Sequence, residues 1–123
     1  MTAIHWLSVA FGGAFGAVAR VGIGTLISAY KPGLPLGTLL VNLLGSFLIG
    51  LAWRYAQTLQ LDPVVTFFLV SGFLGAFTTF SAFSFDVLNL YQEGFLKLAM
   101  AYVFSSTIGG IFFAWLGYTI RID

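Results

Sequence analysis

Four long runs without a charged residue constrain the fold of this chain more than any other feature. Each run holds 19 to 23 residues: Met1–Ala19, Pro32–Trp53, Pro63–Phe85 and Leu98–Ile120. A helix of about 20 apolar residues crosses the hydrocarbon core of a bilayer. Only 7% of the 123 residues are charged, and a soluble domain of this size could not bury four such segments. The sequence therefore predicts an integral membrane protein.

Turn signals set the expected limits of the helices within one transmembrane domain, residues 1–123. Two prolines and a glycine in the segment 31–35 cannot lie inside a helix. Asp62 and Pro63 are typical of a helix start, and Gly94 is typical of the turn after a helix. We predict an all-α membrane protein with transmembrane helices over about 3–29, 36–57, 63–92 and 95–119.

The basic residues do not choose an orientation in the membrane. Four spans place both termini and the loop 58–62 on one side. Arg54 and Arg121 lie near that side, and Lys31 and Lys97 lie near the other. The positive-inside rule then gives no direction. Other factors could fix one orientation, but we favour a chain that inserts both ways and pairs as an antiparallel, dual-topology homodimer.

Small residues recur at helical spacing in the first and fourth predicted helices. Gly12 and Gly16 form one pair, and Ser106, Gly110 and Ala114 form a second stripe. Such stripes let helices approach closely in lipid. We expect them to support assembly of the dimer, and the alternative is packing within one chain.

Polar side chains inside the membrane are candidates for function, because they are costly there. Arg20 must snorkel, pair with a carboxylate or face water. Thr38, Asn42 and Ser46 share one face of the second helix. The Asn42 amide offers two N–H donors to an anion, or it makes a bond between helices.

The segment 72–84 of the third helix is the most unusual part of the chain. It crowds glycines, threonines and serines into the middle of the membrane, which predicts a break in the helix. Irregular backbone at this depth must be buried in protein or line a polar cavity. Beyond the break, Phe80, Phe83 and Ser84 share a face, and the positive edges of aromatic rings can receive an anion. Alternatively, these rings only pack.

The fourth helix and the end of the third add further polar groups. Tyr102 and Ser106 form either a track of hydroxyls or ordinary bonds between helices. Asp86 and Asn89 are expected at the helix end or in a vestibule. The chain has no cysteine, which excludes thiolate sites. It also has no basic cluster for nucleic acid.

Three blocks of sequence resemble the fluoride channels called Fluc or CrcB, and the likeness runs nearly end to end. The blocks are 12–20, ending in Arg20, then 37–46, containing Asn42, and 72–84, containing Thr-Thr-Phe-Ser-Ala-Phe-Ser. The resemblance implies a dual-topology dimer with two fluoride pores, in which Phe80 and Phe83 face the ion. It also implies a multi-pass protein of the cell inner membrane.

The resemblance further assigns roles around the pores. Asn42 would be the pore asparagine, and Arg20 would lie in the vestibule. The polar lining would comprise Thr38, Ser81, Ser84, Tyr102 and Ser106. Backbone carbonyls of Gly75 and Thr78 from both chains would hold one structural sodium ion at the dimer centre, as suits a hard cation.

Some positions depart from the pattern of that family. Ala82 stands where threonine is frequent, and Asp86 stands where glutamate is usual. Ala114 and Gly110 lack hydroxyls that some members carry. These changes affect the predicted polar track of the fourth helix and leave the phenylalanine pair, the asparagine and the sodium-site residues unchanged.

The expected function is passive, electrogenic export of cytoplasmic fluoride by a channel that is not an enzyme, with lipid and a second copy as partners. The main alternative is a small multidrug exporter coupled to protons. That chemistry needs a carboxylate in the first helix, which instead carries Arg20. A membrane scaffold without transport would leave Asn42 and the break without a purpose.

Overall fold

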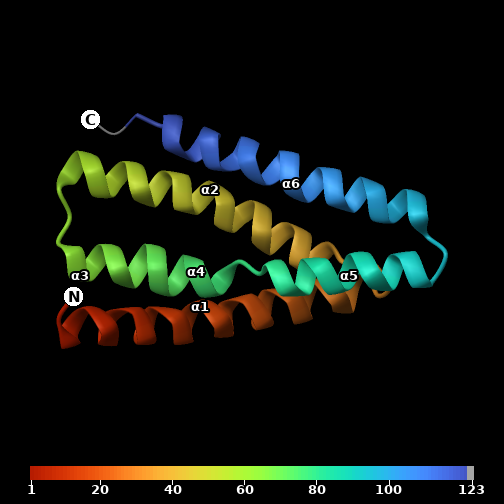
Figure 1. Ribbon diagram of the computed structural model, residues 1–123, viewed down its shortest axis with the longest axis horizontal. Coiled ribbons are helices and arrows are strands. Elements are labelled where there is room, and N and C mark those ends of the chain that lie inside the picture. The colour runs from red at the N-terminus through yellow and green to blue at the C-terminus, as the bar shows by residue number, and fades with distance from the viewer. Residues whose placement is uncertain (122–123) are drawn as a thin grey trace.

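The computed structural model describes residues 1–121, which form a bundle of long helices (Figure 1). The third span, Pro63–Gln92, consists of several elements in sequence. The elements in chain order are α1 (Ala3–Tyr30), α2 (Leu36–Leu59), α3 (Pro63–Thr66), the π-helix η1 (Phe67–Leu74), α4 (Gly75–Phe77), α5 (Phe80–Gln92) and α6 (Leu96–Thr119).

The predicted helices are confirmed. Within residues 1–121, four helical segments are long and apolar enough to cross a membrane. Their ends differ from the predicted ones by no more than two residues, the largest difference being the end of α2 at Leu59. The bend in the third span is also present, and Figure 1 shows it as a non-helical stretch between α4 and α5.

The predicted turn signals act as expected at the helix ends. The Asp62 carboxylate accepts a hydrogen bond of 2.7 Å from the Val64 N–H, and Pro63 is the first helical residue. Gly33 and Gly94 adopt φ values of +87° and +86°, which favour glycine. These short connections bring consecutive spans back into contact.

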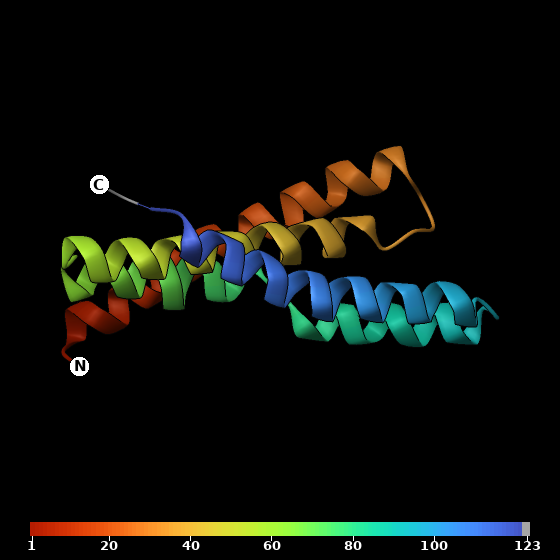
Figure 2. The same ribbon diagram turned by 90° about the horizontal axis from the view of Figure 1, so that it is seen from above.

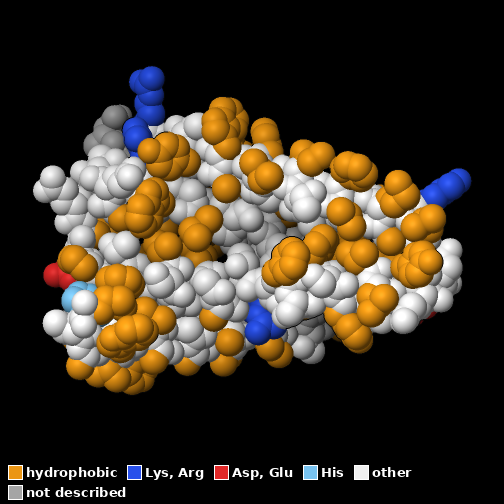
Figure 3. Space-filling view, viewed as in Figure 1, with side chains coloured by type: hydrophobic (Ala, Val, Ile, Leu, Met, Phe, Trp, Pro, Cys, Tyr) orange, Lys and Arg blue, Asp and Glu red, His pale blue; other side chains and the backbone are white. Residues whose placement is uncertain are grey.

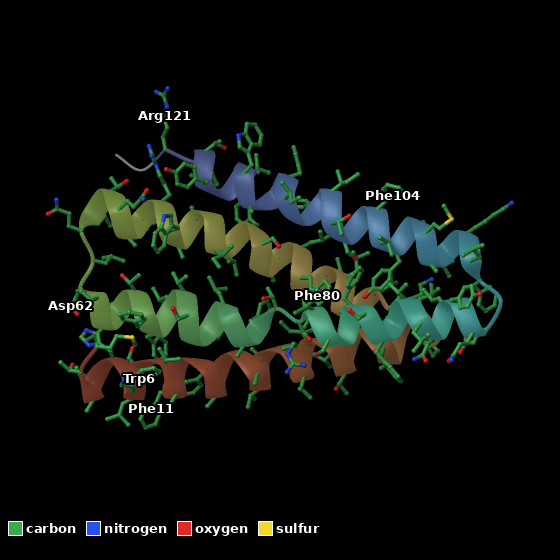
Figure 4. All side chains as sticks on the ribbon, viewed as in Figure 1. Trp6, Phe11, Asp62, Phe80, Phe104 and Arg121 are labelled. Carbon is green, nitrogen blue, oxygen red and sulfur yellow. The ribbon has the colours of Figure 1, made fainter. Side chains whose placement is uncertain are left out.

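The spans form two closely packed pairs. α1 lies along η1 and α4, and α2 lies along α6, while α5 contacts α6 beyond the break. Figure 2 shows that the second half of α1 diverges from α5 and α6. Trp6, Asp62 and Arg121 lie at the same end of the bundle (Figure 4). Figure 3 shows hydrophobic side chains spread over the surface and basic side chains at both ends.

The stripes of small residues pack within the chain, as in the alternative that we kept, and a role in dimer assembly stays a prediction. A Cβ at Gly12 or Gly16 would collide with the backbone carbonyls of Phe68 or Phe73 in η1. On the second pair of helices, a Cβ at Gly50 would collide with the Ala114 carbonyl of α6. The alternative, internal packing, accounts for both stripes.

The π-helix η1 was not predicted. It widens each turn, as shown by the Gly75 N–H bonding to the Val70 carbonyl five residues earlier. The widened turn presents Gly72 to α1, where a Cβ would lie 2.8 Å from the Val9 carbonyl. A sequence pattern cannot reveal this feature, because the extra residue per turn depends on the packing partner.

Replacing Gly16 by alanine tests the close contact between α1 and η1. We expect Gly16→Ala to lower the stability of the protein by about 1–3 kcal/mol, because the added methyl group forces the backbones apart. Gly22→Ala is the matched control, since nothing lies within 4 Å of a Cβ there. Thermal unfolding in detergent measures both variants, and equal melting temperatures would contradict this packing.

Candidate ion-binding site

The site is built around the break in the third span. Thr78 (φ −84°, ψ 155°) and Thr79 (φ −148°, ψ 118°) have extended backbones between two helices. In a continuous helix their peptide groups would bond to residues four positions away. In the membrane interior, groups freed from such bonds need other partners. Side chains from α1 and α2 supply several of them.

Asn42 of α2 pairs with both main-chain groups of Thr79. Its Nδ2 donates to the Thr79 carbonyl at 3.0 Å, and the Thr79 N–H donates to its Oδ1 at 2.8 Å. The side-chain amide thereby pairs with the main chain of Thr79 as the main chain of a neighbouring β-strand would. This is the bond between helices that we kept as an alternative, and it leaves one Nδ2 hydrogen for another acceptor.

Arg20 of α1 contacts the break from another helix. Its Nε donates to the Ala76 carbonyl at 3.1 Å, and the side chain is half-buried. We expected snorkelling, a carboxylate or water, and did not foresee a main-chain carbonyl as the partner. Arg20 and Thr38 also line a cavity of about 360 Å³ that reaches Thr79 and Ala82.

A second cavity, of about 500 Å³, brings together Asn42, Phe80, Phe83 and Ser106. We call it the phenylalanine cavity. Ser46 and Thr107 add hydroxyls to its wall, and Thr78 and Thr79 line it at the break. Two of the three residues on the predicted face of α2, Asn42 and Ser46, therefore meet the start of α5 and the middle of α6 at this cavity, and Thr38 does not line it. Thr79 lines both this cavity and the one beside Arg20.

The two phenylalanines differ in their exposure. Their ring centroids lie 5.7 Å apart at an angle of 47°. Phe83 is 8% exposed and also contacts the Tyr102 ring at 5.2 Å, whereas Phe80 is 77% exposed. Figure 4 labels Phe80 at the start of α5, beside the break. A tilted pair of this kind can offer positive ring edges to an anion, with weak attraction at each edge.

Ser81, Ser84 and Tyr102 do not line the phenylalanine cavity. The Ser84 hydroxyl donates to the Phe80 carbonyl at 3.0 Å, and the Ser81 hydroxyl lies 3.3 Å from that of Thr79. The Tyr102 hydroxyl donates to an Asp86 carboxylate oxygen at 3.0 Å. Of the two predicted track residues, only Ser106 reaches the cavity, and its buried hydroxyl has no partner within residues 1–121.

The carbonyls of Gly75 and Thr78 are suited to a hard cation. The Thr79 N–H, which would bond to Gly75 in a continuous helix, donates to Asn42 instead. The Ala82 N–H, which would bond to Thr78, donates to the Thr79 hydroxyl at 3.3 Å. Residues 1–121 place no group of three or more His, Cys, Asp or Glu for a metal. A cation here would depend on these carbonyl oxygens.

Thr79 is the main site residue that our sequence analysis did not single out. Its hydroxyl caps α5 and its peptide groups bind Asn42. A threonine directly before a helical run is a typical N-cap, so this signal was available. The roles of Ala76 and Thr107 had no such signal, since a main-chain acceptor and a cavity wall depend on the packing of helices.

The sequence of the chain was also compared with those of known proteins. Residues 7–118 match the family model described as "CrcB-like protein, Camphor Resistance (CrcB)". The chain belongs to the CrcB family. The predicted membership is thereby confirmed.

Several relatives of this CrcB protein carry the name "Fluoride-specific ion channel FluC". One from Thermus thermophilus is 45% identical over 94% of both chains. One from Campylobacter jejuni is 46% identical over 93% of this chain and 94% of its own. A third, from Gloeobacter violaceus, is 43% identical over 89% and 90%. These names describe channels and not enzymes, and they do not favour the multidrug exporter.

Replacing Asn42 by leucine tests the bond that holds the break. Asn42→Leu keeps most of the volume but leaves the Thr79 N–H unpaired and removes the Asn42 donor from the Thr79 carbonyl. We expect it to lower the stability of the protein by about 1–3 kcal/mol, the cost of one buried unpaired group. Ser46→Ala, one turn along the same helix and on the same cavity, is the control. Equal thermal stability of the two variants in detergent would argue against the pairing.

Proposed function

We propose that this CrcB protein is a fluoride-selective channel that gives passive, electrogenic export of cytoplasmic fluoride and so reduces fluoride toxicity. The observation that carries the proposal is the identity of about 45% with named fluoride channels over nearly the whole of both chains. The Asn42, Phe80 and Phe83 side chains around one cavity agree with it.

The phenylalanine cavity is suited to a small anion that must keep moving. Fluoride would pass the edges of Phe80 and Phe83 and receive hydrogen bonds from the free N–H of Asn42 and the Ser106 hydroxyl. Each contact is weak, since ring edges carry only partial charge. Ion conduction requires binding that is favourable enough for entry and weak enough for exit. Arg20 adds positive charge near one end of this path.

We further propose that two copies assemble as an antiparallel homodimer in the inner membrane, with a pore on each side. Exposure supports this, because Phe80 and Gly75 lie open on the surface of the single chain. A second copy would cover the exposed ring of Phe80 and close the wall of the pore. It would also bring the two breaks together.

The break could then hold the structural sodium ion. The carbonyls of Gly75 and Thr78 from both copies would bind it, and sodium would supply the positive charge that links the two chains. Oxygen ligands from main-chain carbonyls suit such a hard cation. The bonds made by Asn42 leave these carbonyls without their helical donors.

Fluoride efflux from liposomes that contain the purified protein tests the proposed function. With a potassium ionophore present to balance charge, we expect rapid fluoride release and little chloride release. Release should stop when no ionophore is added, because the flux carries charge. Proton-coupled efflux of organic cations, with no fluoride flux, would overturn the proposal.

Substitution of the two phenylalanines tests the route of the ion. We expect Phe80→Ile and Phe83→Ile each to reduce fluoride flux at least tenfold, because isoleucine has no positive edge. Phe85→Ile is the matched control: it lies on the same helix, is 63% exposed and does not line the cavity. Size-exclusion chromatography checks that the variants remain assembled. Control-level flux in both variants would remove the ring edges from the pathway.

A further inference from the structure

Arg20 is placed to do more than supply charge to a vestibule. It lies on the part of α1 that packs against the third span, and its Nε–H points at the backbone of α4. The Ala76 carbonyl that it bonds at 3.1 Å would accept the Phe80 N–H in a continuous helix. The guanidinium therefore occupies the position of a lost helical donor.

Arg20 and Asn42 divide the freed groups of the break between them. Arg20 takes the Ala76 carbonyl before the extended residues, and Asn42 takes both groups of Thr79, the second of them. The carbonyls of Gly75 and Thr78 are left without their helical donors. The hydrogen bonds made by two side chains from different helices thus determine which main-chain oxygens of the break lack a donor.

We propose that Arg20 is a positioning residue that fixes the backbone of the break in the third span by holding the Ala76 carbonyl. A charged donor forms a stronger hydrogen bond than a neutral one, and the Nε–H has a fixed direction in the plane of the guanidinium. Without it, the Ala76 carbonyl loses this donor, and the backbone between α4 and α5 opens more readily. The inference concerns the backbone of the break and holds for whichever ion passes.

The role of a positioning residue can be separated from that of a vestibule charge. Lysine keeps the positive charge, but it has a methylene group where arginine has the Nε–H donor, and it lacks the planar guanidinium. If Arg20 acts only as a charge, Arg20→Lys should behave as the wild-type protein. If Arg20 holds the break, Arg20→Lys should resemble Arg20→Met, in which the charge is also lost.

Hydrogen–deuterium exchange of the assembled protein, read by mass spectrometry, tests the proposal. Peptides covering 74–84 report on the break, and peptides covering 100–118 report on α6. We expect both Arg20 variants to exchange about tenfold or more faster at 74–84, as loss of one charged hydrogen bond predicts. Exchange at 100–118 should remain unchanged, whereas a general loss of folding would raise both.

Lys97→Met is the matched control, because it removes one positive charge from the exposed start of α6. We expect it to leave exchange at 74–84 unchanged. If Arg20→Met does not fold, Arg20→Lys carries the test alone, since it keeps the charge and the apolar stem. Wild-type exchange at 74–84 in Arg20→Lys would overturn the proposal. Because exchange is read without fluoride, its outcome is independent of whether the protein conducts that ion.

Discussion

Peptide groups freed at mid-membrane are the constraint on which the rest of this structure depends. A bilayer interior offers no water to bond them, so a break is tolerated only where protein supplies partners. Here a carboxamide and a guanidinium do so, at Thr79 and Ala76. Thr79 also lines both the phenylalanine cavity and the cavity beside Arg20. The cost of interrupting the helix is thus offset by the residues that shape the candidate pore.

Close helix packing makes these partners available. Gly12 and Gly16 let α1 lie directly against η1, which brings Arg20, one turn further along, to the break. On α2, a Cβ at Gly45 would collide with the Thr78 side chain, so glycine there lets Asn42 approach Thr79. The small residues first considered for assembly therefore serve the site through packing within the chain.

Run lengths, charges and turn residues were sufficient to predict the spans and their ends, because these depend on local composition. The break could be placed within 72–84, since glycines, threonines and serines crowd there. Which groups of the break Arg20 and Asn42 bind could not be predicted, because Ala76 and Thr79 bond through main-chain groups, which carry no side-chain signal. The π-helix and the packing of the glycine stripes within the chain were not predicted for a similar reason. Both depend on which helix packs against the segment in the folded chain.

The central claim is that two antiparallel copies meet at their breaks, and pulsed electron paramagnetic resonance tests it directly. The chain has no cysteine, so one nitroxide per copy can be attached through Ser81→Cys or Tyr91→Cys, both at exposed positions of α5. Ten helical residues rise about 15 Å, and opposite directions double that offset. The account predicts a short distance between the nitroxides at 81 and one longer by roughly 20–30 Å at 91. Similar distances at the two positions would indicate parallel copies and contradict it.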